Sequence, residues 1–336
     1  MKNKRKTRVT RRDVAEAAGV SETIVSYVMN GNRYVKEEKR QRVLEAVERL
    51  NYQPNHLARS LKMQKSRHLL FLTDDLRSEH FGDVMDAMET ILFSENYLIS
   101  LSRYRTDSGY INDLIARQFD GVFISSSSLD TDTLKQLSRA GVATVMVQRN
   151  SIDEVPENCA IINSGLYRGE KLLLDHLYAS GCRRILFANR SVSDQNETFW
   201  EDPRVTAYED FCREKNLEKL IMAPSPSDEE FRSRLKGCLS GKERPDAISA
   251  FNDRTAVEVL RITKELGINV PGDLAVSGFD NTKLSEYISP SLTTISVDRR
   301  DMAQKMLDTM FELIETGKAE DQSCNIKLIK RESTGI

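Results

Sequence analysis

The chain has 336 residues, which is long enough for two or three domains, and 39% of them are hydrophobic, which is enough to bury a core in each. It contains no run of about 18 apolar residues and no apolar core of a signal peptide near its start, so we expect a cytoplasmic protein without a membrane segment. The five cysteines are scattered and form no C-x-x-C pair, which indicates reduced thiols and neither a disulfide framework nor a zinc site.

The net charge of −2 conceals a strong asymmetry along the chain. Residues 1–67 carry 17 Lys and Arg against 7 Asp and Glu, a balance of +10, so the remaining residues carry 32 against 44, a balance of −12. A basic segment joined to an acidic body is typical of proteins that bind a polyanion such as nucleic acid. A solvated basic tail is the alternative for residues 1–8, but the patterned sequence that follows argues against it.

The basic segment predicts two short helices separated by a turn. Thr10 is placed to cap the first helix, with Asp13 in the capping-box position, and Gly19 ends it. Ser21 is placed to cap a second helix over residues 22–29, which ends at Asn30 and Gly31. We expect the apolar core of these two helices and their turn to consist of Val14, Ala17, Ala18, Val20, Ile24, Val25 and Val28.

A helix-turn-helix unit places its second helix in the major groove of DNA and contacts the bases with side chains near that helix's N-terminus. The side chains expected to do so here are Glu22, Thr23, Ser26 and Tyr27. Ordinary solvated helix surface is the alternative for each. Glu22 is the weakest candidate, because phosphates repel a carboxylate unless it accepts a hydrogen bond from a cytosine amine.

A third helix is predicted over residues 36–50, and a separate short helix follows it. Val43, Leu44, Val47 and Leu50 recur at helical spacing and are expected to close the small core. Pro54 disfavours helix immediately before it, and the residue after it, an asparagine, is placed to cap a helix within residues 55–67. A helix this short is marginal in water by itself, because helix nucleation is costly.

From residue 68 onward, apolar strands alternate with helices. This pattern predicts two α/β lobes with parallel sheets and a cleft between them, and ligands of such sheets sit outside the carboxyl ends of the strands. We expect the second lobe to begin near residues 159–163. The predicted strands include residues 68–75, 98–104, 120–128, 142–150, 159–163, 182–190, 245–253 and 273–281.

The first 62 residues contain "DVAEAAGVSETIVSYVMNG" and "LNYQPNHLARSLK", and this combination resembles the DNA-binding head of the lactose-repressor/galactose-repressor (LacI/GalR) family of bacterial transcription regulators. Later stretches such as "FDGVFISSS" and "PDAISAFNDRTAVEVLRITKELGINVPGDLAVSGFDN" are similar to the effector-binding domain of the same family. The resemblance implies an all-α helix-turn-helix head plus an α/β two-lobed domain with the periplasmic-binding-protein-like fold. The implied domains are a head at 1–54, a hinge helix and linker at 55–67, and an effector-binding and dimerisation domain at 68–336.

The resemblance also implies roles for the hinge. Leu61 matches the leucine that family members insert between base steps in the minor groove, while Leu57 and Ala58 would pack against the hinge of a partner subunit. Arg59 and Lys62 would hold phosphates.

Four residues match effector-contacting positions of the family. Arg204 matches an arginine that holds the effector, and its guanidinium offers a rigid fork of donors; a surface arginine before a helix is the alternative. Asn252 and Asp280 also match such positions, with a local cap or Asx-turn as the alternative for each. Phe81 falls where some members stack an aromatic ring on the ligand, with core packing as the alternative.

Other positions bear on the identity of the ligand. The serines at 125–128 end a predicted strand and are either hydroxyl donors or loop residues. Val297 stands where many members have glutamine, and Gln148 stands where many have Asp or Asn, so the chemistry of the cleft is expected to differ. Sugars are the leading effector class, and purine-like ligands and phosphosugars stay open.

The expected function is that of a homodimeric, ligand-controlled repressor of carbohydrate-utilisation genes, which binds a pseudo-palindromic operator DNA and a sugar or sugar derivative. A solute-binding protein of a transporter is the first alternative, but it would need an export signal and no basic head. A sugar-acting enzyme is the second, but the chain has no phosphate-binding loop, nucleophile elbow or zinc motif, and its four histidines are dispersed. We therefore expect no catalysis, metal or cofactor.

Overall fold

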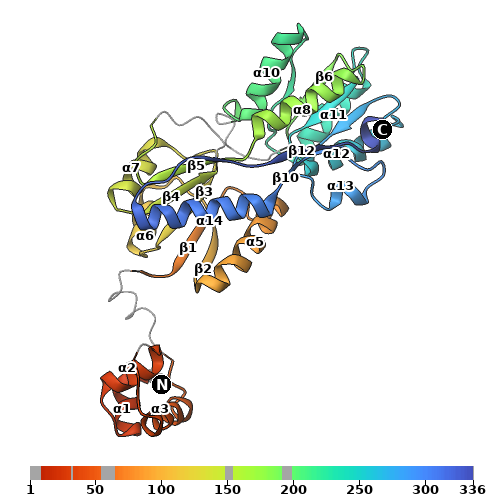
Figure 1. Cartoon of the computed structure of the whole chain (residues 1–336). Helices are drawn as coiled ribbons and strands as arrows, with labels where there is room; N and C mark the ends of the chain where they lie inside the picture. Colours follow the sequence, from red (N-terminus) through yellow and green to blue (C-terminus); the bar gives the residue numbers. More distant parts are fainter. Residues whose placement is uncertain (1–8, 32, 54–64, 148–153, 191–198, 336) are drawn as a thin grey trace, which may run out of the picture. The chain divides into compact units, whose positions relative to one another are not determined.

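The computed structural model describes residues 9–31, 33–53, 65–147, 154–190 and 199–335 (Figure 1). The chain divides into two compact units, Met1–Ser66 and Arg67–Ile336. None of the helices in these described ranges is long and apolar enough to cross a membrane.

The first unit contains three helices, α1 (Arg11–Ala18), α2 (Glu22–Asn30) and α3 (Glu37–Arg49). Their ends follow from local chemistry, as predicted: Thr10 and Asp13 form a reciprocal capping box at α1, and Ser21 caps α2. Gly19 and Gly31 end the two helices with φ values of 63° and 62°, which glycine adopts at little cost.

Two residues predicted in the core of this unit lie outside it. The side chains that are buried are Val14, Ala15, Ala18, Val25, Val43, Ala46 and Tyr52. Ala17 is exposed and Leu44 is 42% exposed. The reason is the rotation of each helix about its axis: successive residues differ by roughly 100°, and the packing of α1 against α3 turns Ala15 and Ala46 inward instead.

The second unit has two lobes, each built on a parallel sheet. The sheet of lobe 1 has the strand order β11-β5-β4-β3-β1-β2, and Leu69 and Phe71 of β1 face one side while Leu70 and Leu72 face the other. Helices α5 and α14 cover the first side, and α6 and α7 cover the second (Figure 1). The bounds are β1 (His68–Thr73), β2 (Leu98–Arg103), β3 (Gly121–Ser125), β4 (Ala143–Val147), β5 (Cys159–Asn163), β11 (Gln322–Ser323), α5 (Glu79–Glu95), α6 (Ser108–Ala116), α7 (Thr131–Arg139) and α14 (Arg299–Thr316).

The sheet of lobe 2 has the strand order β7-β6-β8-β9. Helices α8 and α10 pack on one of its faces, and α11 and α12 pack on the other. The bounds are β6 (Ile185–Ala188), β7 (Leu220–Met222), β8 (Ala247–Ala250), β9 (Ala275–Ser277), α8 (Leu166–Ala179), α10 (Pro203–Lys215), α11 (Asp228–Ser240), α12 (Asp253–Glu265), α13 (Leu284–Tyr287) and the 3-10 turn η1 (Glu332–Thr334).

The prediction that the second lobe begins at residues 159–163 is wrong. These residues form β5, which pairs in parallel with β4 and belongs to the sheet of lobe 1. The chain enters lobe 2 only with α8, returns to lobe 1 after β10 (Thr294–Val297) to form α14, and comes back with β12 (Ile326–Ile329), which pairs antiparallel with β10 (Figure 1). Strands that pair in a sheet can be far apart in the sequence. The alternation of strands and helices along the chain therefore does not show to which sheet each strand belongs.

Candidate DNA-binding surface and effector site

Helix α2 presents its N-terminal half to solvent. Val25 is fully buried against α1 and α3, which fixes the rotation of α2 and leaves Glu22 and Thr23 exposed. Ser26 and Tyr27 are half-buried further along the helix. All four predicted base-contacting residues thus lie on α2, two of them exposed and two half-buried.

The half-buried pair is held in place by local contacts. The Ser26 hydroxyl accepts a hydrogen bond from Asn30 Nδ2 at 3.1 Å. The Arg33 guanidinium lies 5.2 Å from the centre of the Tyr27 ring, and its Nη1 lies 3.4 Å from the Tyr27 hydroxyl. Sequence reasoning missed Arg33, because its contact with Tyr27 depends on the turn that ends α2.

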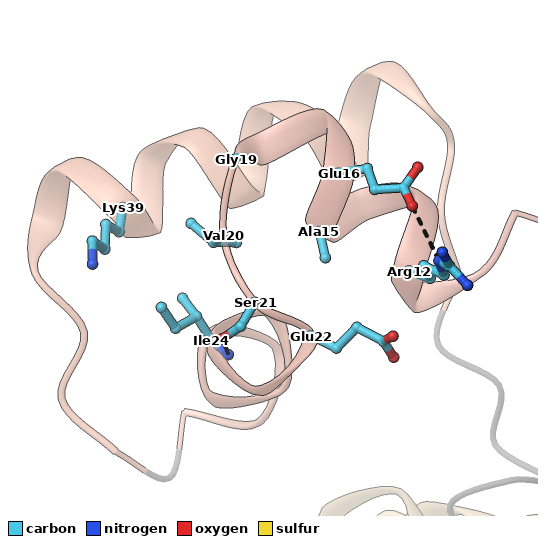
Figure 2. A pocket seen from close by; sticks show the side chains of 9 residues that line it. All are labelled: Arg12, Ala15, Glu16, Gly19, Val20, Ser21, Glu22, Ile24 and Lys39. Atoms are coloured by element: carbon cyan, nitrogen blue, oxygen red, sulfur yellow. Dashed lines mark hydrogen bonds and ion pairs between the residues drawn. The ribbon is translucent and has the colours of Figure 1, made fainter.

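A surface hollow of about 600 Å³ lies in the angle between α1 and α2 (Figure 2). Lys39 stands on one side of it, and Arg12 stands on the other, where its Nε donates to Glu16 at 3.0 Å. Glu22 is also on its wall. Two cations thus face two carboxylates, so the hollow is balanced in charge and we assign no anion to it.

The predicted hinge residues Leu57, Ala58, Arg59, Leu61 and Lys62 lie outside the described residues, as does Gln148.

In the second unit, the carboxyl ends of the strands of the two lobes face each other. Asp75, which follows β1, lies 3.7 Å from Nη1 of Arg254, which follows β8. Glu79, at the start of α5 in lobe 1, accepts a hydrogen bond from the backbone of Lys283 in lobe 2 at 2.9 Å. These contacts bring the strand-end loops of both sheets to one region.

Arg204 is buried at this edge of lobe 2, with 4% of its surface exposed. Its Nε and Nη2 donate to the two carboxylate oxygens of Asp202 at 2.9 and 2.8 Å, and its Nη1 donates to the carbonyl of Phe251 at 2.7 Å. The guanidinium also lies 3.5 Å from the centre of the Phe251 ring and 5.4 Å from that of Phe279. Burial lowers the pKa of Arg204, but the charge and hydrogen bonds of Asp202, together with the charges of Asp280 and Glu170, more than offset this and raise it.

Asn252 and Asp280 stand at the neighbouring strand ends. Asn252 caps α12, and its Oδ1 accepts hydrogen bonds from the backbone and the hydroxyl of Thr255, both at 2.9 Å. Asp280 has φ of 107°, and its carbonyl accepts a hydrogen bond from Arg299 Nη2 at 2.6 Å. The charge of Asp280 acts on Arg204, so the structure brings these two predicted residues together.

Phe81 has the packing role that the sequence left open. It is 8% exposed, and its ring lies 5.4 Å from that of Phe71 in the core of lobe 1. The serines at the end of β3 support a carboxylate: the hydroxyl of Ser126 donates to Asp74 at 2.6 Å, and the backbone and hydroxyl of Ser127 donate to the same side chain at 2.9 and 3.1 Å. Val297 is also buried in the core of lobe 1.

Two further carboxyl groups were missed by sequence reasoning. Glu170 is fully buried, its Oε1 accepts a hydrogen bond from the Ser249 hydroxyl at 2.6 Å, and burial raises its pKa to about 7. Asp253 accepts hydrogen bonds from Thr282 and Thr294, and burial together with the charge of Asp280 raises its pKa to about 7. The sequence did contain a signal for the burial of Glu170. This residue precedes buried leucines of α8 by three, four and seven positions, so it lies on the same face of the helix as they do.

Known proteins match the chain over nearly its whole length. Residues 10–55 match the model of bacterial regulatory proteins of the lacI family, and residues 174–334 match that of a periplasmic binding protein-like domain. The HTH-type transcriptional repressor PurR of Vibrio vulnificus (strain CMCP6) is 29% identical over 321 residues, which cover 91% of this chain and 92% of that protein.

Solved structures have the same architecture. The lac repressor dimer bound to operator and the anti-inducer ONPF is similar with a TM-score of 0.83 and 25% identity, over 98% of this chain and 99% of that one. The transcriptional regulator CelR in complex with cellobiose has a TM-score of 0.67 and 23% identity, over 97% and 100% of the two chains.

Proposed function

The chain belongs to the LacI family of bacterial transcription regulators, and we propose that it represses genes of carbohydrate utilisation by binding a pseudo-palindromic operator as a ligand-responsive dimer. The observation that carries this proposal is the joining of a capped helix-turn-helix, with exposed Glu22 and Thr23, to a two-lobed domain with buried Arg204 at its strand ends. The proposed domains are a head at 1–54, a hinge at 55–67 and an effector-binding domain at 68–336.

The head and the hinge would divide the work of DNA binding. Side chains of α2, namely Thr23, Ser26, Tyr27 and Glu22, would contact bases in the major groove. The leucine at 61 would enter the minor groove, where an inserted apolar side chain kinks DNA. The basic balance of residues 1–67 supports phosphate contacts that supply affinity independent of base sequence.

One edge of lobe 1 supports the dimer. Strand β2 is the last strand of its sheet, so its outer edge pairs with no strand among the described residues. Leu98 on this strand is 71% exposed, Leu101 is 37% exposed, and Phe93 at the end of α5 is 86% exposed. A second copy of the chain related by a two-fold axis would bury these three side chains.

The effector would bind at the facing strand ends, with Arg204, Asp280 and Asn252 of lobe 2 as polar contacts, while Phe81 would support the lobe 1 side from its core. Cellobiose in the CelR complex supports a sugar or sugar derivative as its class. Binding would favour one relative placement of the lobes. It would change the fraction of protein able to bind operator only if the effector binds the operator-competent and operator-incompetent states with different affinities. The protein would act in the cytoplasm and catalyse no reaction.

Selection of genomic fragments by the purified full-length protein tests the proposal. The recovered DNA should contain an inverted repeat, and Thr23→Ala should weaken binding to it by about tenfold, since one base contact is worth about 1–3 kcal/mol. Gln41→Ala, an exposed substitution on α3, is the matched control and should bind as the wild type does. Recovery of no common sequence, or turnover of a sugar by the protein, would refute the proposal.

A further inference from the structure

The balance of charge around Arg204 bears on which effectors the site accepts. Three carboxyl groups act on this single guanidinium and a fourth acts on one of them: Asp202 binds it directly, Asp280 and Glu170 interact with its charge, and Asp253 interacts with Asp280. The cluster defined by these five residues, which we call the Arg204 cluster, therefore has more acidic than basic groups.

The guanidinium fork of Arg204 is already occupied. Arginine recognises phosphate and carboxylate groups through two parallel N–H bonds, and here Nε and Nη2 make such a pair with Asp202. A third N–H is used by the Phe251 carbonyl. Two of the roughly five N–H donors of the side chain are left, which suits one or two hydroxyl oxygens but offers no uncompensated positive charge.

Arginines from neighbouring strand ends also lie near carboxylates, but across the described ranges none of them makes two N–H bonds to one carboxylate as Arg204 does. Arg190, after β6, donates to Asp228 at 2.7 Å, and its side chain is 15% exposed. Arg254 lies 3.7 Å from Asp75, and Arg299 lies 3.4 Å from Asp83 while its Nη2 donates to the Asp280 carbonyl. Each of these charges has a carboxylate nearby, while Nε of Arg190 and Nε of Arg299 are buried without a hydrogen-bond partner among the described residues.

One buried carboxyl group of the Arg204 cluster is incompletely hydrogen-bonded. Glu170 Oε2 has no hydrogen-bond partner within the described part of the chain, although Oε1 of the same group accepts from Ser249. The pKa of about 7 leaves this group partly ionised near neutral pH, and an anion nearby would repel that ionised fraction because Coulomb repulsion is strong where water is excluded.

We propose that the effector is an uncharged, hydroxyl-rich compound and that the site rejects its phosphorylated and carboxylated analogues. The hydroxyl groups of such a ligand donate to Asp280, the one carboxylate of the Arg204 cluster that is not buried, and accept from the remaining N–H groups of Arg204. An anionic ligand loses its hydration shell and meets a guanidinium whose field Asp202 cancels. This inference rests on the proposed function, since it concerns the effector of the same site.

The only tryptophan of the chain provides a direct readout of the test. Trp200 is 52% exposed and precedes Arg204 by four residues. Its fluorescence in the full-length protein is titrated with matched compounds: glucose, glucose 6-phosphate and gluconate; ribose and ribose 5-phosphate; cellobiose; hypoxanthine and its nucleotide. Binding of a neutral sugar with at least about tenfold preference over its anionic analogue is expected, while preference for an anionic compound or for hypoxanthine would overturn the inference.

The variant Asp202→Asn tests the cause of the selectivity. Asparagine retains the cap of α10 but removes the charge that compensates Arg204. Inorganic phosphate at constant ionic strength should therefore raise the melting temperature of this variant and leave that of the wild type unchanged. Asp210→Asn, which alters the Asp210–Arg213 pair on the same helix, is the control and should behave as the wild type.

These results separate the inference from the proposed function. Equal stabilisation of the wild type and Asp202→Asn by phosphate would overturn the charge argument, even if no sugar in the set binds. An anionic compound that alters operator affinity would overturn the inference and leave the ligand-responsive repressor intact. A neutral sugar that binds but never alters operator affinity would support the inference and contradict the proposed regulation.

Discussion

The Arg299 guanidinium connects lobe 1 to the strand-end loop of lobe 2, because its Nε lies 3.4 Å from Asp83 Oδ2 on α5 while its Nη2 donates to the Asp280 carbonyl at 2.6 Å. Asp280 and Asn281 both have positive φ, so this loop has an unusual backbone that the arginine helps to hold. We therefore expect a displacement of the Asp280 loop at the proposed effector site to alter the contact between Arg299 and Asp83 on α5.

Asp83→Asn is expected to weaken the response to ligand. Loss of the ion pair removes one contact that senses the Asp280 loop, so the ratio of operator affinities with and without effector should fall by about threefold or more. Stability should change by less than about 1 kcal/mol, because the pair is partly exposed. Fluorescence anisotropy with labelled operator measures the ratio.

Asp86→Asn, an exposed substitution on the same helix, is the matched control for Asp83→Asn. It should leave the affinity ratio unchanged. An equal fall in both variants would show that the charge of α5, and not the contact with Arg299, is responsible.

Leu61→Ala is expected to weaken operator binding by at least about tenfold while effector affinity stays the same. The leucine is proposed to unstack a base step, and alanine is too short to do this. Electrophoretic mobility shift reports the first quantity, and Trp200 fluorescence reports the second. Equal loss of both would indicate a folding defect and would remove the leucine from the proposed DNA interface.

Arg204→Ala is expected to abolish the ligand response and also to destabilise the protein by about 3 kcal/mol, because it leaves the buried Asp202 carboxylate without its partner. The double variant Asp202→Asn with Arg204→Met removes both charges. It should recover most of the stability, measured by urea unfolding, yet remain unresponsive to ligand. Recovery of the ligand response in the double variant would contradict the assignment of Arg204 to the effector site.

Glu170→Gln is expected to flatten the pH dependence of stability. The pKa of Glu170 is raised from 4.5 to about 7, so the folded state keeps a proton in this range that the unfolded state releases. The stabilisation is present below the unfolded pKa and is lost as the pH rises through 7, by up to about 3 kcal/mol. Glutamine keeps the acceptor for Ser249 but does not ionise.

Urea unfolding of both proteins at pH 5 and pH 8 measures this effect. The stability of Glu170→Gln relative to the wild type should increase between the two pH values. Asp253 titrates in the same direction but is present in both proteins, so it cancels from the difference. A difference that stays constant with pH would show that Glu170 does not titrate in this range.

The features that were predicted correctly are those that depend on near neighbours in the chain. Thr10, Asp13, Gly19 and Ser21 set the ends of α1 and α2 through contacts within about three residues, so caps and turns were correctly predicted. The alternation of apolar strands with helices likewise predicted two parallel sheets. Strands of such sheets are covered by helices on both faces, so their sequences are almost continuously apolar. The match of Arg204 to a family motif pointed to the region where Asp280 also lies.

Which surfaces meet, and which charges come together there, depends on how the elements pack in three dimensions. Leu44 is exposed and Ala46 is buried because α1 fixes the rotation of α3, and β5 belongs to lobe 1 because it pairs with β4. Burial of Glu170 and Asp253 arises where several elements converge, and no local pattern measures the number of carboxyl groups around Arg204. Electrostatic and packing energies depend on distances through space, and the order of residues along the chain does not contain those distances.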